Sequence, residues 1–144
     1  MEQNKTLMKA IARTRRAWNN HVKKIALSVG IPDSYRTVIM FLSRKPGANQ
    51  CNIAEFADVT TSAINQTVKS MLAEGYLRKE TDGSDKRHSK LFLTEKGEEA
   101  AMKLRERLHT SDDIITALIT SEKEAEFIEL LDQITDCIRR DLSC

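Results

Sequence analysis

The chain has 144 residues, a length typical of one domain that can bury a core of its own. It is rich in charged residues but has only five glycines and two prolines, a balance that favours helix. Its formal net charge of +2 argues against a non-specific polycation, and no run approaches the roughly 18 apolar residues of a membrane span.

The charge is unevenly distributed along the chain. Residues 1–30 carry seven basic side chains and one acidic one, whereas residues 98–144 carry 12 acidic and 6 basic ones. Two explanations remain open. The two end segments attract each other, or the chain concentrates positive charge on one surface for an anionic partner.

The N-terminal residues lack the apolar segment of a signal peptide, so we expect a cytoplasmic protein without a membrane partner. Three cysteines, Cys51, Cys137 and Cys144, are widely spaced and odd in number. They do not form a disulfide framework.

Four helices are predicted in the first half of the chain. Apolar residues recur there at helical spacing, and Gly30 and Pro32 are a stop signal for the first helix. The short third helix is expected to bury Ile53 and Phe56. The predicted helices cover about residues 5–29, 34–44, 51–57 and 62–75.

The fourth predicted helix has two distinct faces. Its apolar residues are spaced to point into the core, and its polar residues recur at steps of three and four on another face. The apolar set is Ile64, Val68, Met71 and Leu72, and the polar set is Ser62, Asn65, Gln66 and Lys69.

A hairpin and two further helices follow. Strands are predicted at 76–81 and 90–94, joined by turn residues that begin at Asp82-Gly-Ser-Asp85. Thr94 is expected to cap a helix over 95–119, and a capping box, Ser121 with Glu124, to open the last helix. The apolar residues of that last helix are expected to lie inward: Phe127, Leu130, Leu131, Ile134 and Ile138.

The element order is therefore α-α-α-α-β-β-α-α, a mostly helical fold with a small β-hairpin wing. A helix sized for the DNA major groove beside a basic hairpin sized for the minor groove is typical of a winged helix-turn-helix. We expect one domain over 1–144, with the DNA-binding region at 31–97. The function predicted is sequence-specific binding of double-stranded DNA to regulate transcription.

The segments 1–30 and 98–144 are predicted to be dimerisation helices. Their apolar stripes are longer than so small a domain can cover, and a partner chain could cover them. A symmetric homodimer also suits a palindromic operator, whose half-sites lie about 34–36 Å apart.

Three stretches of the chain resemble the MarR (multiple antibiotic resistance regulator) family. They are residues 62–76, which end in Met-Leu-Ala-Glu-Gly-Tyr, then Asp82-Gly-Ser-Asp-Lys-Arg87, and Leu93-Thr94-x-x-Gly97. Length and element order extend the resemblance over essentially the whole chain. It implies a dimeric winged-helix transcription factor, usually a repressor, often released by small aromatic or phenolic ligands. Some family members sense oxidants through a cysteine.

The resemblance also implies roles for individual residues. Ser62, Ala63, Asn65, Gln66 and Lys69 match major-groove positions, Arg87 matches a wing-tip arginine that enters the minor groove, and Asp85 matches the acid that holds it. The chemistry agrees, because Asn and Gln can bind adenine in a bidentate manner and Arg suits a narrow A·T minor groove. Lys86, His88 and Lys90 are expected to contact phosphates, although His88 could equally be a bystander.

Family ligands lodge between the winged helix and the dimer helices. The matching residues for a small aromatic effector are Arg15, Trp18, His21 and Tyr35. A core position for Trp18 and a surface position for His21 are the competing explanations. A cysteine-based redox regulator, with Cys51 near a helix start, is an alternative.

The alternatives outside gene regulation are weaker. A protein-interaction module without DNA binding would favour an apolar face where the fourth helix is polar. An enzyme is not expected, since the chain has no phosphate-cradling glycine loop, no nucleophile elbow and no His/Cys pair at metal spacing. We therefore expect no catalytic residue, metal or cofactor.

Overall fold

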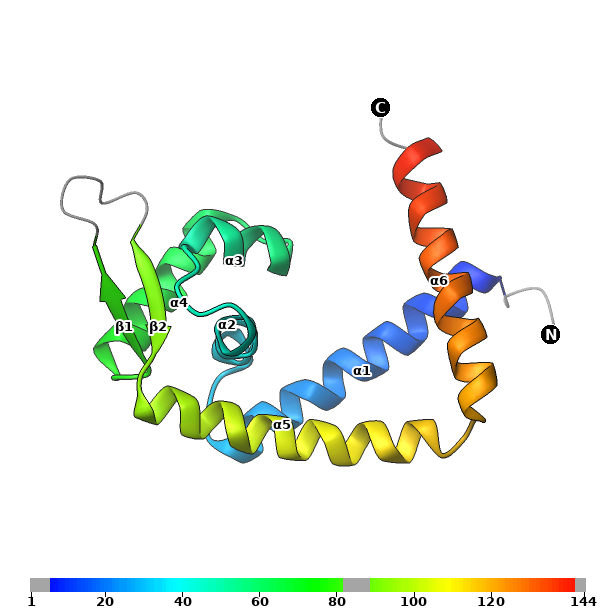
Figure 1. Ribbon diagram of the computed structural model, residues 1–144, viewed down its shortest axis with the longest axis horizontal. Helices are drawn as coiled ribbons and strands as arrows, with labels where there is room; N and C mark the ends of the chain where they lie inside the picture. Colours follow the sequence, from blue (N-terminus) through cyan, green and yellow to red (C-terminus); the bar gives the residue numbers. More distant parts are fainter. Residues whose placement is uncertain (1–5, 82–88, 142–144) are drawn as a thin grey trace. The chain divides into compact units, whose positions relative to one another are not determined.

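The computed structural model describes residues 6–81 and 89–141. The described residues form six helices and one two-stranded antiparallel hairpin (Figure 1). Contacts divide the chain into two units, Met1–Arg107 and Leu108–Cys144, and the boundary falls within α5. The elements are α1 (Leu7–Val29), α2 (Asp33–Arg44), α3 (Gln50–Ala57), α4 (Thr61–Ala73), β1 (Leu77–Glu80), β2 (Lys90–Leu93), α5 (Glu95–Thr116) and α6 (Ser121–Asp141).

Local signals in the sequence set the ends of α1. The hydroxyl of Thr6 accepts a hydrogen bond from the Lys9 amide, which caps the helix start. Gly30 ends the helix in a left-handed conformation with φ of +88°, a region that suits glycine. The predicted stop at Gly30 is confirmed.

A short turn separates α3 from α4. Asn49 and Asn52 form a reciprocal capping box at the start of α3, with hydrogen bonds of 2.9 and 3.1 Å. Asp58 ends α3 with a positive φ of 54°, and Thr60 caps α4 through a 3.2 Å bond from the Ala63 amide. The helix-turn-helix is thus closed by a cap on each side of the turn.

The core of the first unit is built around α2, which contacts α1, α3, α4 and β2. Each large apolar side chain that is fully buried there contributes about 1.5–3 kcal/mol relative to exposure. Figure 1 shows α2 end-on among the other elements of this unit. The largest fully buried side chains are Ile39, Leu42, Ile53, Met71, Leu91, Leu104, Val38 and Val68.

The wing strands pair with Leu77 opposite Leu93 and Glu80 opposite Lys90. A third segment, absent from the sequence prediction, joins the other edge of β2. The amide of Gly47 donates to the Leu91 carbonyl at 2.9 Å, and the Leu91 amide donates to the carbonyl of the next residue, Ala48, at 3.0 Å. Gly47 has a φ of +81° and lies against the Phe92 ring, so a side chain there would be strained.

Two predictions about the second half of the chain need correction. The last helix is capped by Thr120 rather than Ser121, because the Thr120 hydroxyl accepts from the Lys123 amide. The preceding helix ends at Thr116, three residues earlier than expected. Thr94 does cap α5, since its hydroxyl accepts a 3.2 Å bond from the Gly97 amide.

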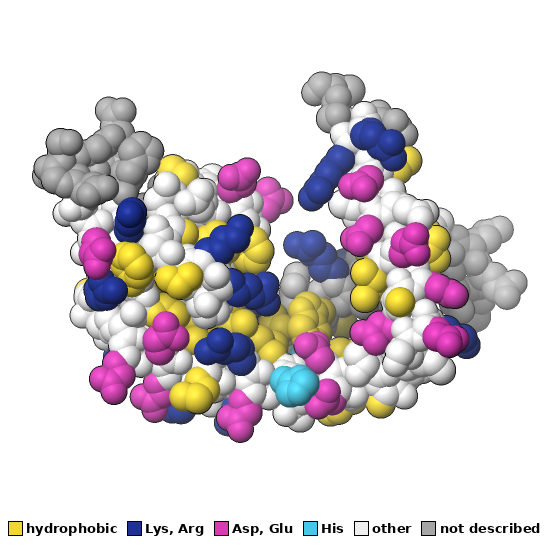
Figure 2. Space-filling model, viewed as in Figure 1, with side chains coloured by type: hydrophobic (Ala, Val, Ile, Leu, Met, Phe, Trp, Pro, Cys, Tyr) yellow, Lys and Arg dark blue, Asp and Glu magenta, His cyan; other side chains and the backbone are white. Residues whose placement is uncertain are grey.

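The prediction that α6 turns its apolar residues inward is wrong for this chain alone. Phe127 and Leu130 are each 55% exposed, Ile138 is exposed, and Leu131 and Ile134 are only half-buried. None of residues 108–140 is buried, because the second unit has too few layers to enclose a core. On the face shown in Figure 2, hydrophobic side chains lie among acidic ones along α6.

The prediction for Phe56 is also wrong, since its side chain is 57% exposed. It packs beside Phe41 at a ring separation of 5.0 Å and leaves its outer side open.

Within the described residues, no single helix is long and apolar enough to cross a membrane. α1 and α2 meet that test of length and composition only as a pair, and they are bent by 89°.

Candidate nucleic-acid interface

The two faces of α4 differ as the sequence predicts. Ile64, Val68 and Met71 are buried, and through them α4 packs on α2, α3 and β1. On the opposite face Ser62, Ala63, Gln66 and Lys69 are exposed and Asn65 is half-buried. One helix therefore has its apolar side committed to the core and its polar side turned outward.

The outward side chains of α4 have no partners within the described part of the chain. No hydrogen bond or ion pair there engages the side-chain groups of Asn65, Gln66 or Lys69. By contrast, Thr67 donates to the Ala63 carbonyl at 3.2 Å and is satisfied locally. The two amides and the ammonium group are therefore available to another molecule.

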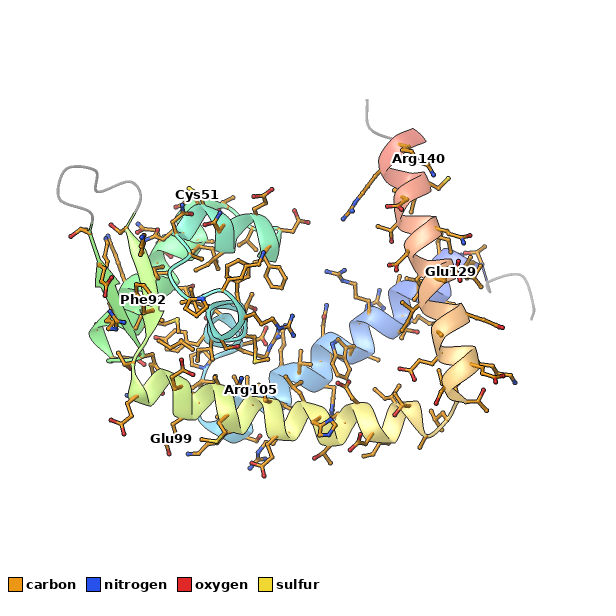
Figure 3. The ribbon with its side chains drawn as sticks, viewed as in Figure 1. Cys51, Phe92, Glu99, Arg105, Glu129 and Arg140 are labelled. Atoms are coloured by element: carbon orange, nitrogen blue, oxygen red, sulfur yellow. The ribbon has the colours of Figure 1, made fainter. Side chains whose placement is uncertain are left out.

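The two strands of the wing carry three basic side chains, Arg78, Lys79 and Lys90. The guanidinium of Arg78 lies 4.3 Å from the centre of the Phe92 ring and pairs with the Glu80 carboxylate. Figure 3 shows Phe92 on β2 within this hairpin. Lys79 and Lys90 are exposed on the two strands. The predicted wing-tip residues Asp85, Lys86, Arg87 and His88 lie outside the described residues.

Of the predicted effector residues, Trp18 and His21 lie together on α1, with ring centres 5.8 Å apart. Trp18 is half-buried, whereas His21 and Arg15 are exposed. Tyr35 has different neighbours: it is 5% exposed, and its ring contacts Tyr76 edge-on at 5.7 Å.

The hydroxyl of Tyr35 donates a 2.9 Å hydrogen bond to the Glu74 carboxylate. Burial raises the pKa of Tyr35 above its ordinary value, and the bond to Glu74 raises it further. Tyr35 therefore stays protonated and ties α2 to the end of α4. Its role in effector binding remains a prediction.

Two cysteines are exposed. Cys51 is the second residue of α3 and lies at the surface (Figure 3), and Cys137 is on α6. Cys144 lies outside the described residues. In the segments 6–81 and 89–141, no group of three or more His, Cys, Asp or Glu side chains is placed to hold a metal ion.

An open groove beside α3 was missed by sequence reasoning. It has a volume of about 580 Å³ and is lined by Phe41 and Phe56, with the Lys45 ammonium 5.8 Å from the centre of the Phe41 ring. The spacing of Phe56 fits the core face of a helix, so the sequence held no signal that this ring would be exposed.

Comparisons with known proteins agree with this geometry. A family model described as the MarR family matches residues 29–88. The uncharacterized HTH-type transcriptional regulator YybA of Bacillus subtilis (strain 168) is 30% identical over 96 residues, which are 67% of this chain and 64% of YybA.

Two solved structures have the same fold. Staphylococcus aureus MarR, in complex with salicylate and kanamycin, gives a TM-score of 0.83 at 16% identity, covering 93% of this chain and 91% of that one. The transcriptional repressor CouR, bound to a 23-mer DNA duplex, gives 0.78 at 21% identity, covering 90% of this chain and 92% of that one. The predicted winged helix fold is confirmed.

Proposed function

We propose that the chain is a member of the MarR family of transcriptional regulators and, from this premise, a sequence-specific repressor of a palindromic operator in double-stranded DNA. One observation carries the proposal. The polar face of α4 has no partner among the described residues, while its apolar face is fixed in the core.

The chemistry of that face suits base edges in the major groove. The amides of Asn65 and Gln66 can each offer one donor and one acceptor to an adenine, and the Ala63 methyl group can contact the methyl of thymine. Ser62 can bond a base or a phosphate, and Lys69 can reach a guanine or a phosphate. The DNA-bound state of the similar CouR fold supports this placement.

The wing completes the proposed contact. Arg87 would enter the minor groove, with Asp85 fixing its direction, and Lys86, His88 and Lys90 would contact phosphates. Lys90 is exposed where β2 begins, which supports its part in this assignment.

A homodimer is the second part of the proposal. The exposed apolar side chains of α5, of α6 and of the turn between them are the surface that a second copy would cover. They include Ile114, Ile115, Leu118, Ile119, Phe127, Ile128, Leu130 and Ile138. Burying such a surface between two copies would place two α4 helices for two half-sites.

Release by a small aromatic effector is the third part. The S. aureus relative in fold is bound to salicylate, which supports a ligand of this class. Arg15, Trp18 and His21 share α1, where the Trp18 ring could stack on an aromatic ligand and the other two side chains could bond a carboxylate. Tyr35, whose ring contacts Tyr76 edge-on, would add an aromatic contact to the ligand.

The test of base contact compares two asparagines. Asn65→Ala should relax the preference at particular base pairs of a selected duplex by roughly 1–3 kcal/mol, with little change at other positions. Asn20→Ala, the same substitution on the exposed side of α1, is the matched control and should leave the preference unchanged. Equal weakening on all sequences by Asn65→Ala would make this residue a phosphate contact and would sink the assignment.

A further inference from the structure

We propose that Lys96 is a positioning residue for DNA recognition: it holds the exit of α4 at a fixed angle to the wing without touching DNA. The inference rests on the proposed function, since it concerns how the recognition helix is aimed. It assigns Lys96 a role that its exposed place at the start of α5 does not by itself suggest.

Three consecutive backbone carbonyls follow the end of α4, and each accepts a hydrogen bond from a group at the start of α5. The Glu74 carbonyl accepts from the Lys96 ammonium at 2.8 Å. The Gly75 carbonyl accepts from the Thr94 hydroxyl at 2.5 Å, and the Tyr76 carbonyl accepts from the Thr94 amide at 3.0 Å. The path from recognition helix to wing is therefore bonded residue by residue to α5.

The helix itself explains why a cation is useful at this place. The last turn of α4 contains no basic side chain, and its C-cap residue, Glu74, adds a negative charge. The carbonyl end of a helix carries partial negative charge and favours a nearby cation. Lys96 supplies that cation from a different element, α5. The negative charge at the end of α4 is therefore compensated only while α5 keeps its position.

The Lys96 side chain is held on a second side. Its ammonium lies 4.3 Å from the centre of the Tyr76 ring, and Tyr35 packs edge-on against that ring. Tyr35 also bonds the Glu74 carboxylate. Glu74 is thus held by its carbonyl from α5 and by its carboxylate from α2, so the end of α4 is fixed from two directions.

In this arrangement the orientation of α4 depends on Lys96, whereas the stability of the fold does not. Lys96 is exposed, and the two Thr94 bonds and the packing of Gly97 against the Tyr76 carbonyl do not involve its side chain. Base recognition needs donors and acceptors placed within about 0.5 Å, whereas phosphate attraction tolerates small shifts. Loss of Lys96 should therefore reduce discrimination between sequences more than it reduces general DNA affinity.

The experiment uses the full chain and a duplex selected from random DNA with the wild-type protein. The readout is the ratio of affinities for the selected duplex and for a scrambled duplex of equal length. Lys96→Met keeps the aliphatic stem and removes the donor and the charge. Lys103→Met is the matched control, because Lys103 is another exposed lysine of α5 and pairs with Glu99.

Lys96→Met should lower the ratio roughly 10-fold, the loss expected when one bidentate base contact is misplaced. Its affinity for the scrambled duplex should match that of Lys103→Met, since both lose one charge. Lys96→Arg should restore the ratio, because arginine can still donate to the carbonyl and lie over the ring. Lys96→Leu, which also lacks a donor and a charge, is tested in parallel and should behave as Lys96→Met does even if the methionine variant folds poorly.

An unchanged ratio in Lys96→Met or Lys96→Leu, or a failure of Lys96→Arg to restore it, would overturn the inference. The proposed function fails separately. If the wild-type protein itself prefers no sequence, the DNA-binding proposal is wrong, whatever the variants do.

Discussion

Tyr35 and Glu74 are 39 residues apart in the chain, yet the hydroxyl of one donates a 2.9 Å hydrogen bond to the carboxylate of the other. The bond joins α2, the centre of the core, to Glu74, the C-cap residue of α4. It is partly buried, so solvent competes with it less than with a surface bond. This contact makes the orientation of α4 dependent on the packing of α2.

Tyr35→Phe tests this contact through stability. At pH 8 the variant should be less stable by about 1 kcal/mol, the usual net value of one hydrogen bond. The pKa of Tyr35 is raised in the folded state, so its stabilising effect is present below the unfolded-state pKa and is lost as pH rises through the folded-state pKa. The stability gap between wild type and variant should therefore narrow above about pH 10.

Urea denaturation of both proteins at pH 8 and near pH 11 measures that gap directly. A gap that stays constant or widens with pH would show that the Tyr35 phenol does not titrate as its surroundings require.

Gly97→Ala tests the close approach of α5 to the wing. A Cβ at Gly97 would collide with the Tyr76 carbonyl oxygen and would press on the Leu93 side chain. Alanine in a helix is ordinarily favoured over glycine, but here overpacking should destabilise the fold by about 1–3 kcal/mol. Glu98→Ala, at the exposed neighbouring position, is the control for denaturation experiments. A variant as stable as wild type would mean that α5 does not pack this tightly on Tyr76.

Arg87→Ala tests the wing. It should weaken binding most for duplexes whose flanks are A·T-rich, because a narrow minor groove attracts a guanidinium most strongly. Arg105→Ala on α5 removes the same charge from an exposed position outside the winged helix and serves as control. Fluorescence anisotropy at physiological salt gives both affinities, and an Arg87→Ala protein with wild-type affinity would remove Arg87 from the interface.

Leu130→Glu tests the dimer. Wild-type protein should sediment at micromolar concentration as one species of twice the 16.3 kDa chain mass. Placing a charge at the exposed Leu130 of α6 should shift the protein to the monomer and abolish tight binding of a two-half-site duplex. Glu129→Gln, on the same helix, should leave the dimer intact. A wild-type monomer would contradict the half-site argument.

Local signals predicted most of the fold. Gly30, Thr94 and the alternation of Ile64 and Val68 with polar neighbours placed the end of α1, the start of α5 and the two faces of α4 correctly, because caps and helical spacing act over a few residues. The same spacing failed for Phe127 and Leu130. A pattern shows that a face is apolar, but it cannot show whether the chain itself supplies a cover.

The hydrogen bonds that hold α4 and β2 in place could not be predicted from the sequence for a related reason. The bonds from Lys96 to the Glu74 carbonyl and from Gly47 to the Leu91 carbonyl join residues that are 22 and 44 positions apart. Neither lysine nor glycine carries a sequence signal for such a partner. The residues proposed to enter the major groove were different, since their type and spacing alone predicted that they lie on the outward face of α4.

Selection of bound duplexes from random DNA with the full-length wild-type protein tests the central claim most directly. We expect enrichment of one palindrome whose half-sites are separated by about one helical turn, 34–36 Å. Recovery of no enriched sequence, or of a single half-site without symmetry, would contradict it.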